Sequence, residues 1–237
     1  MPAGRACPSV YTFKASPYSS HSLILRQLPA HGEGRRVLDL GCSGGYLASI
    51  LSGRGFRVTG VDVAGSDRGR FPPEGLFVEA DLDSGLPPLS GEFDFVVCGD
   101  VLEHLKDPPR LLTQIRSALA PGAVLIASLP NSGHLYFRLT VLLGRFPADD
   151  RGLFDRTHLH FYTWTGWREM FSRAGFLISE VQGTGTPFGL AFPDWSESPP
   201  VRFLEQISAA FAGVWKTMFA YQFVVAAREA PAGEKRR

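Results

Sequence analysis

Short apolar runs alternate with amphipathic segments along most of this chain of 237 residues. Five of these runs have the length and composition of buried strands, and they lie at 37–40, 56–62, 76–82, 93–98 and 123–129. Helices are expected at 46–52 and at 110–120, the second opened by Pro108 and ended by Gly122. Strands that alternate with helices predict a parallel sheet with crossover connections.

The pattern changes after residue 130, where a long excursion at 131–162 precedes another helix and two more strands. These last elements are expected at 164–174, 176–181 and 219–228. The sequence therefore predicts an α/β fold with a doubly wound, mostly parallel seven-stranded sheet of the Rossmann-like kind. We expect an N-terminal cap segment at 1–34, one domain at 35–229 and a flexible tail at 230–237.

The strongest chemical signal lies where the first strand, which carries Asp39, runs into a glycine-rich turn at 41–45. Glycine permits unusual backbone conformations and a close approach to a ligand, and the next helix points its N-terminus at the turn. The charge of Asp39 would repel a pyrophosphate, so a cationic ligand is favoured. Asp62 ends the second strand about 20 residues further on, where an acid can bind a ribose diol.

At this point the chain resembles the class I S-adenosylmethionine-dependent methyltransferases. The motifs are VLDLGCSGGYL from Val37, the strand end at Asp62, ADL, and FDFVVCGDVLEHLKDPPRLL followed by LAPGAVLIASLPN. The resemblance implies S-adenosylmethionine as cofactor. It implies that the glycine turn and Asp39 hold the methionine part, that Asp62 binds the ribose, and that Asp81 and Leu82 flank the adenine. Ser43 stands where the family more often has glycine. The cofactor-binding residues implied in this way are Asp39, Gly41, Cys42, Ser43, Gly44, Asp62, Val63, Asp81, Leu82 and Gly99.

Within the excursion, residues 134–146 read as an apolar helix with an arginine near each end. Long insertions in compact domains are usually functional, and this one is expected to form a lid over the acceptor substrate. A lid helix packed on the core is the favoured interpretation. An apolar acceptor channel or a contact with a membrane surface is the alternative.

Histidines are the candidates for acid–base chemistry, because imidazole titrates near neutral pH and can take a proton from a hydroxyl. His158 and His160 lie in the excursion and share one face if the segment is extended. His104 follows the fourth strand, between the expected cofactor and acceptor sites. We expect His104 and His158 to be the catalytic pair, facing the acceptor from opposite sides.

A divalent metal is an alternative use of this region, although the sequence does not require one. Asp100, Glu103 and His104 offer oxygen and imidazole ligands about one helical turn apart. The segment Leu102 to Asp107 also looks like that of the ubiquinone-type O-methyltransferases. Lining of the adenine side is the competing interpretation for Glu103 and His104.

Composition limits the remaining possibilities. A formal net charge of +1 gives no electrostatic reason to expect a nucleic-acid partner. The three cysteines, Cys7, Cys42 and Cys98, have neither the number nor the spacing of a disulfide or zinc framework. No apolar segment has the length of a membrane span or the flanks of a signal peptide, so a cytoplasmic location is expected.

Taken with the resemblance, these features predict methyl transfer from S-adenosylmethionine to a small-molecule acceptor, most simply to an oxygen atom. Aromatic residues in and after the excursion suggest an apolar or ring-shaped acceptor, and a place in the core is the competing interpretation for them. A lipid-linked or glycan-linked acceptor and peripheral membrane contact are also compatible with this function. Residues 128–134 and 155–160 also look like MetW-type proteins, so a regulatory or partner subunit that keeps the fold is the alternative. A nicotinamide-dependent enzyme fits less well, because the turn lacks the full G-x-G-x-x-G spacing.

Overall fold

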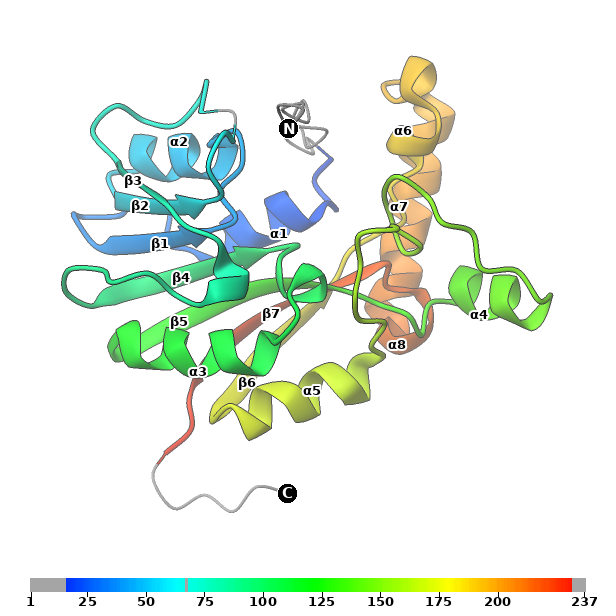
Figure 1. The fold of residues 1–237 in the computed structure, drawn as a ribbon. Helices are drawn as coiled ribbons and strands as arrows, with labels where there is room; N and C mark the ends of the chain where they lie inside the picture. The colour runs from blue at the N-terminus through cyan, green and yellow to red at the C-terminus, as the bar shows by residue number, and fades with distance from the viewer. Residues whose placement is uncertain (1–15, 67, 232–237) are drawn as a thin grey trace, which may run out of the picture.

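The computed structural model describes residues 16–66 and 68–231, with a seven-stranded sheet at its centre (Figure 1). The strand order is β3-β2-β1-β4-β5-β7-β6. Strands β1 to β5 pair in parallel, whereas β7 is antiparallel to both β5 and β6. The predicted fold class is confirmed. The strands are β1 (Arg36–Leu40), β2 (Arg57–Asp62), β3 (Leu76–Glu79), β4 (Phe93–Gly99), β5 (Leu119–Pro130), β6 (Phe176–Gly183) and β7 (Gln222–Glu229).

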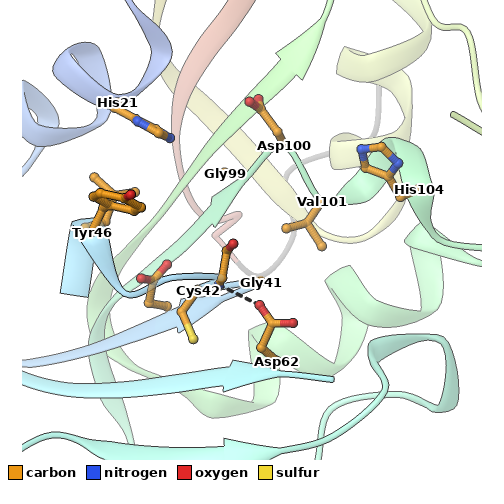
Figure 2. A pocket seen from close by; sticks show the side chains of 12 residues that line it. His21, Gly41, Cys42, Tyr46, Asp62, Gly99, Asp100, Val101 and His104 are labelled. Atoms are coloured by element: carbon orange, nitrogen blue, oxygen red, sulfur yellow. Dashed lines mark hydrogen bonds between the residues drawn. The ribbon is translucent and has the colours of Figure 1, made fainter. Parts of the chain in front are cut away.

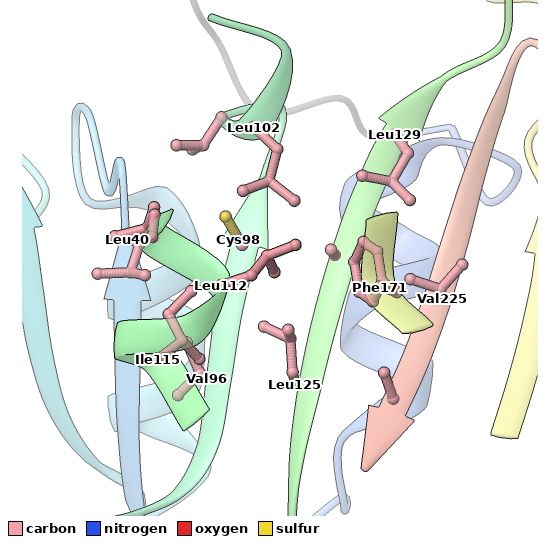
Figure 3. Packing of buried hydrophobic residues seen from close by; sticks show 14 of the residues in the cluster. Leu40, Val96, Cys98, Leu102, Leu112, Ile115, Leu125, Leu129, Phe171 and Val225 are labelled. Atoms are coloured by element: carbon pink, nitrogen blue, oxygen red, sulfur yellow. The ribbon is translucent and has the colours of Figure 1, made fainter. Parts of the chain in front are cut away.

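Helices cover both faces of the sheet, as the burial of consecutive residues along the central strands requires. Val37 of β1 packs in one core with α1 (Ser20–Gln27) and α2 (Tyr46–Gly53). The next residue, Leu38, packs in the other core with α3 (Pro108–Ala118) and α5 (Trp164–Arg173), because successive strand residues point to opposite faces. Figure 3 shows this second core between the sheet and the helices α3 and α5.

One boundary differs from the prediction. Helix α3 ends at Ala118, and β5 already begins at Leu119, which pairs with Phe93. The turn residues that were expected to separate helix from strand instead lie inside β5, at a break in its register with β4. Gly122 has a φ of 79°, and Pro121 has no N–H to give to a ladder, so this pair interrupts the pairing without ending the strand.

The chain between β6 and β7 contains helices that the sequence pattern did not reveal. They are α6 (Phe188–Ala191), η3 (Pro193–Trp195), α7 (Pro199–Val214) and α8 (Lys216–Phe219). Two other short 3-10 helices, η1 (Leu82–Ser84) and η2 (Leu102–His104), follow β3 and β4. Between β2 and β3, the described residues of 64–75 form no helix.

The helix of the excursion, α4 (Leu135–Leu142), is shorter than expected. None of its residues is buried, and Leu142 is 80% exposed. The expected packing is limited to ring contacts with the buried Phe154, on which Phe137 stacks, and the role of the excursion as a lid stays a prediction. In Figure 1 α4 lies beyond the ends of the strands, away from the helices that cover the sheet.

Some expectations concern residues that the structure does not describe. Residues 1–15 of the cap segment, Cys7 and residues 232–237 of the tail lie outside the described range. Among the described residues, no helix combines the length and apolar character that crossing a bilayer demands.

Candidate functional site

The glycine-rich turn leaves β1 in a backbone conformation that only small or glycine residues adopt easily. Gly41 has a φ of 68°, Ser43 one of 43° and Gly45 one of 77°. A Cβ atom added to Gly41 would lie 2.5 Å from Cγ2 of Val101, so the turn has no room for a side chain here. The turn therefore forms a cradle of exposed backbone directly before the N-terminus of α2.

Asp62, at the end of β2, fastens this turn. Its Oδ2 accepts a hydrogen bond of 2.6 Å from the backbone N–H of Ser43, drawn dashed in Figure 2, and its Oδ1 accepts one of 2.7 Å from the N–H of Val63. Each carboxylate oxygen has more than one lone pair, so Asp62 can hold the turn and still accept bonds from ligand hydroxyls.

Asp39 is 2% exposed, and its Oδ2 has no hydrogen-bond partner. Burial, and secondly the charge of Asp62, raise the pKa of Asp39 to about 7. The same burial, with the nearby Asp39 charge, raises the pKa of the Cys42 thiol, so Cys42 stays a neutral thiol. A buried carboxylate oxygen without a partner at the base of a glycine cradle suits a cationic ligand group.

These groups line one cavity of about 330 Å³. Figure 2 shows the cavity, with Tyr46 and His21 on one side, His104 on the other and Asp100 between them. Six of the expected cofactor residues line it: Asp39, Gly41, Cys42, Ser43, Asp62 and Gly99.

Four expected cofactor residues do not line this cavity. Gly44 accepts a hydrogen bond from the N–H of Arg70, and Val63 is half-exposed beside Asp62. The Asp81 side chain caps η1 by accepting from the N–H of Asp83, and Leu82 is buried in the core. Their assignment to the cofactor stays a prediction.

Sequence reasoning missed several residues of the cavity, namely His21, Tyr46, Leu47 and Val101. His21 lies on α1, within the segment 1–34 that was expected to form an N-terminal cap, yet no motif singled out this side chain. Tyr46 and Leu47 could have been found from their position in the first turn of the helix after the glycines.

Asp100 has an unusual conformation, with a φ of 55° in a residue that is not glycine. Its Oδ1 accepts hydrogen bonds from Ser128 Oγ (2.5 Å) and from Gln222 Nε2 (2.8 Å). The neighbouring strands β5 and β7 thus hold this strained residue at the cavity wall. Its carboxylate serves this network and does not join Glu103 in a metal-ligand group.

The structure places His104 and His158 side by side, and not on opposite sides of the cavity as had been expected, and their assignment as the catalytic pair stays a prediction. Their ring centroids lie 4.8 Å apart, but only His104 lines the cavity. The His158 side chain is 7% exposed, and its Nε2 lies 3.9 Å from Glu103 Oε1. Burial, and secondly the neighbouring His104, lower the pKa of His158 to about 4, so it is neutral at pH 7 and a weak base.

His160 has a structural contact on the same side of the segment. Its Nε2 lies 2.9 Å from the carbonyl oxygen of Leu105, and its ring stacks on Tyr162. A carbonyl only accepts, so Nε2 donates and His160 fastens the excursion to the segment after η2.

A group with metal-ligand chemistry is also present, although its members differ from those suggested by sequence. Glu103, His104 and His158 each place one ligand atom within 4.8 Å of the others. Two imidazoles and a carboxylate are ligands that suit a transition-metal ion.

A family model described as a methyltransferase domain matches residues 14–181 of the chain. The chain belongs to the S-adenosylmethionine-dependent methyltransferases. The resemblance seen in its sequence motifs is confirmed. The cavity of this methyltransferase also fits that cofactor, because it combines the glycine cradle with the unpartnered oxygen of Asp39.

Relatives with curated names include ubiquinone biosynthesis O-methyltransferases. That of Psychrobacter arcticus is 27% identical over 161 residues, covering 63% of this chain and 62% of the relative. That of Chromobacterium violaceum is 32% identical over 167 residues, covering 64% of this chain and 68% of the relative. The match to the protein of Aeromonas salmonicida covers 66% of that relative. The chain thus spans about two thirds of the length of these relatives.

Solved structures show the same fold. An S-adenosylmethionine-dependent methyltransferase from Mesorhizobium loti has a TM-score of 0.60 at 21% identity, covering 89% of this chain and 98% of that one. The 1,6-didemethyltoxoflavin-N1-methyltransferase of Burkholderia thailandensis, with bound S-adenosylhomocysteine, has a TM-score of 0.59 at 19% identity, covering 94% and 81%.

Proposed function

We propose that the protein methylates an oxygen atom of a small, apolar acceptor, with His104 as the base. The observation that carries this proposal is that His104 lines the same cavity as the glycine turn and Asp62. An imidazole across the cavity from the cofactor cradle is suited to take the proton of a hydroxyl as it is methylated. The O-methyltransferase relatives support the same reaction type.

S-adenosylmethionine supplies an electrophilic methyl group, so the protein's own task is alignment, exclusion of water and removal of one proton. Asp39 and the turn hold the charged end of the cofactor, and Asp62 accepts from its ribose hydroxyls. His104 receives the acceptor proton while the new C–O bond forms and the C–S bond breaks, its electron pair remaining on sulfur. Imidazolium then returns the proton to solvent.

Aromatic side chains support an apolar acceptor. Phe137 of α4 stacks on Phe154, with 4.5 Å between the ring centroids. The ring centroid of Phe161 lies 5.2 Å from that of Phe146 and 6.0 Å from that of His158. This aromatic cluster joins the histidine pair to the exposed apolar helix α4. In contrast, Trp167 is fully buried, so that aromatic belongs to the core.

The surface of α4 extends this proposal to a lipid-linked acceptor and contact with a membrane surface. Leu139, Leu142 and Leu143 are 48%, 80% and 73% exposed, and residues 131–148 contain Arg138 and Arg145 but no acid. A cytoplasmic location is part of the proposal; the buried Cys42 and Cys98 are free thiols.

Mass spectrometry of ligand retained by the purified protein, followed by a screen of hydroxylated acceptors, tests the reaction. Calorimetry should show binding of S-adenosylhomocysteine and none of NAD. The reverse result would reject the cofactor, and methylation confined to nitrogen or carbon would reject the reaction type.

Sedimentation with vesicles of phosphatidylcholine and phosphatidylglycerol tests the membrane part. Leu142→Glu should reduce the sedimented fraction, whereas Leu177→Glu, on exposed β6, should not. Equal sedimentation of both variants and the parent chain would remove α4 as the contact.

A further inference from the structure

The excursion reaches back to His104 through two residues that no motif assigned to the site. Nδ1 of His104 lies 3.0 Å from Thr157 Oγ1 and 3.2 Å from the backbone oxygen of Thr157. The hydroxyl of Thr157 in turn donates to Asp155 Oδ1 at 2.6 Å. These contacts form a chain of hydrogen bonds from a buried carboxylate to the imidazole.

The polarity of this chain follows from the number of donors. A threonine hydroxyl has a single hydrogen, and that hydrogen is used on Asp155, so Oγ1 can only accept from His104. The backbone oxygen of Thr157 is also an acceptor only. Both contacts therefore require a hydrogen on Nδ1 of His104. In a neutral imidazole with Nδ1–H, the lone pair is on Nε2.

The carboxylate that sets this polarity is fixed in place. Asp155 is 3% exposed, and its Oδ1 also accepts from the backbone N–H of Thr157 at 2.8 Å. The N–H of Asp155 donates to the oxygen of Gly152 at 3.2 Å. Because the carboxylate is held by its own loop, it does not depend on His104 for its position.

The excursion is also tied to η2 at its backbone, so the distance to His104 is maintained. The N–H of Leu159 donates to the oxygen of Glu103 at 2.9 Å, and His160 contacts the oxygen of Leu105. His158, directly before these two residues, packs its ring against His104. The imidazole of His104 is thus held by hydrogen bonds at Nδ1 and by the ring of His158.

We propose that Asp155 and Thr157 are positioning residues that hold His104 in the Nδ1–H tautomer and direct the basic Nε2 to the acceptor. Free histidine favours the opposite tautomer, with the hydrogen on Nε2. In that tautomer Nε2 has no free lone pair with which to take the proton from the acceptor. The catalytic part of this inference rests on the proposed function. The tautomer itself does not, since it follows from the hydrogen bonds alone.

The tautomer can be measured without a known acceptor. A long-range ¹H–¹⁵N spectrum of the full chain labelled with ¹⁵N-histidine, at about pH 8, separates protonated from unprotonated ring nitrogens of neutral histidines. His104→Gln identifies the signals of His104 among the six histidines. We expect Nδ1 of His104 to carry the hydrogen. A hydrogen on Nε2 in the parent chain would overturn the inference.

Two matched variants test the role of the hydroxyl. Thr157→Val keeps the branched shape at an exposed position and the backbone oxygen at 3.2 Å, but it removes the nearer of the two acceptors of Nδ1, so the fraction of His104 in the Nδ1–H form should fall. Thr157→Ser keeps the hydroxyl and should keep the Nδ1–H signal. If Thr157→Val has the same tautomer as the parent chain, the hydroxyl does not position His104 and the inference fails.

With an acceptor in hand, kcat should fall about tenfold in Thr157→Val and stay near the parent value in Thr157→Ser, with KM for S-adenosylmethionine unchanged in both. A KM effect without a kcat effect would contradict a positioning role. If the tautomers behave as expected while His104→Ala keeps full turnover, the base in the proposed function is wrong, and the catalytic role of Thr157 falls with it, but the tautomer assignment stands.

Discussion

Asp62 accepts a 2.6 Å hydrogen bond from the backbone N–H of Ser43, and this contact joins the end of β2 to the cofactor turn of β1. It explains how a serine can occupy a position with a φ of 43°, where the family more often has glycine. The strain of the left-handed conformation is offset by a hydrogen bond to a charged acceptor. Asp62 therefore shapes the turn and lines the cavity at the same time.

Asp62→Ala should weaken binding of S-adenosylhomocysteine by about 1.5–3 kcal/mol, because the ligand and the turn both lose a charged acceptor. Calorimetry measures this loss. Glu79→Ala is the matched control: it removes an acid from β3 at the position paired with Asp62, but Glu79 does not line the cavity. Equal affinities for the Asp62 variant and the control would leave Asp62 without a part in binding.

Gly41→Val should remove cofactor binding, because the new side chain would begin 2.5 Å from Val101 and require a positive φ. Gly213→Ala, at a position with open space, is the control for the general effect of losing a glycine. Circular dichroism establishes that both variants are folded. A folded Gly41 variant that still performs the protein's biological role would favour the regulatory-subunit alternative over the enzyme.

Asp39→Asn should stabilise the ligand-free protein at neutral and alkaline pH. The pKa of Asp39 is about 7 in the folded state, compared with 3.8 for an ordinary aspartate, which stands for the unfolded state. The folded state therefore binds the proton more tightly. Stability from this group is present below about pH 4 and is lost as pH rises through 7, by on the order of 2–4 kcal/mol. Denaturation of both proteins between about pH 4 and pH 8 measures the difference.

The lowered pKa values of His134 and His158 change stability in the opposite direction. The stability that these two histidines contribute is lost as pH falls from 6.5 toward 4, in the parent chain and in the Asp39 variant alike. They cancel in the comparison of parent and Asp39 variant. If the two proteins have the same pH dependence, Asp39 is not the buried charge that the structure indicates. The variant should also bind S-adenosylhomocysteine less tightly, since it lacks the charge.

Sequence reasoning found the parts of the fold whose causes are local. The strands from β1 to β4 are short and mostly apolar, and the turn at Gly41 needs a residue type that the sequence shows directly. The helix α7 was missed because five of its apolar side chains are exposed, so no simple stripe marks a buried face: Phe203, Leu204, Ile207, Phe211 and Val214. Most of the cavity near the cofactor turn was foreseen for the same local reason.

The acceptor side depended on contacts between distant segments. His104 and Thr157 are 53 residues apart, and neither residue alone indicates that a hydroxyl will accept from an imidazole. Likewise Asp100 was grouped with Glu103 from spacing, whereas Gln222, 122 residues away, engages its carboxylate. Such pairings are set by tertiary packing.

A chelator separates metal-assisted catalysis from catalysis by the protein groups alone. If Glu103, His104 and His158 hold a divalent ion, activity should be lost with chelator and restored by a divalent metal ion, and Glu103→Gln should weaken that restoration. Asp100→Asn is the comparison, because Asp100 is absent from this group. If the chelator does not change activity, these residues do not act as ligands of a catalytic metal ion.

His104→Ala should lower turnover by roughly a hundredfold or more, because it removes the only imidazole of the pair that lines the cavity. His158→Ala should have a smaller effect on kcat, since His158 is buried with a pKa of about 4 and supports the ring of His104. Affinity for S-adenosylhomocysteine should remain nearly intact in the His158 variant and fall in the His104 variant, which borders the cofactor. Steady-state kinetics with calorimetry measures both quantities. A hundredfold loss confined to His158→Ala would transfer the base to the excursion. Full turnover in both variants would mean that neither histidine of this pair is the base, and would leave His21, which also lines the cavity, or alignment and water exclusion alone to account for the reaction.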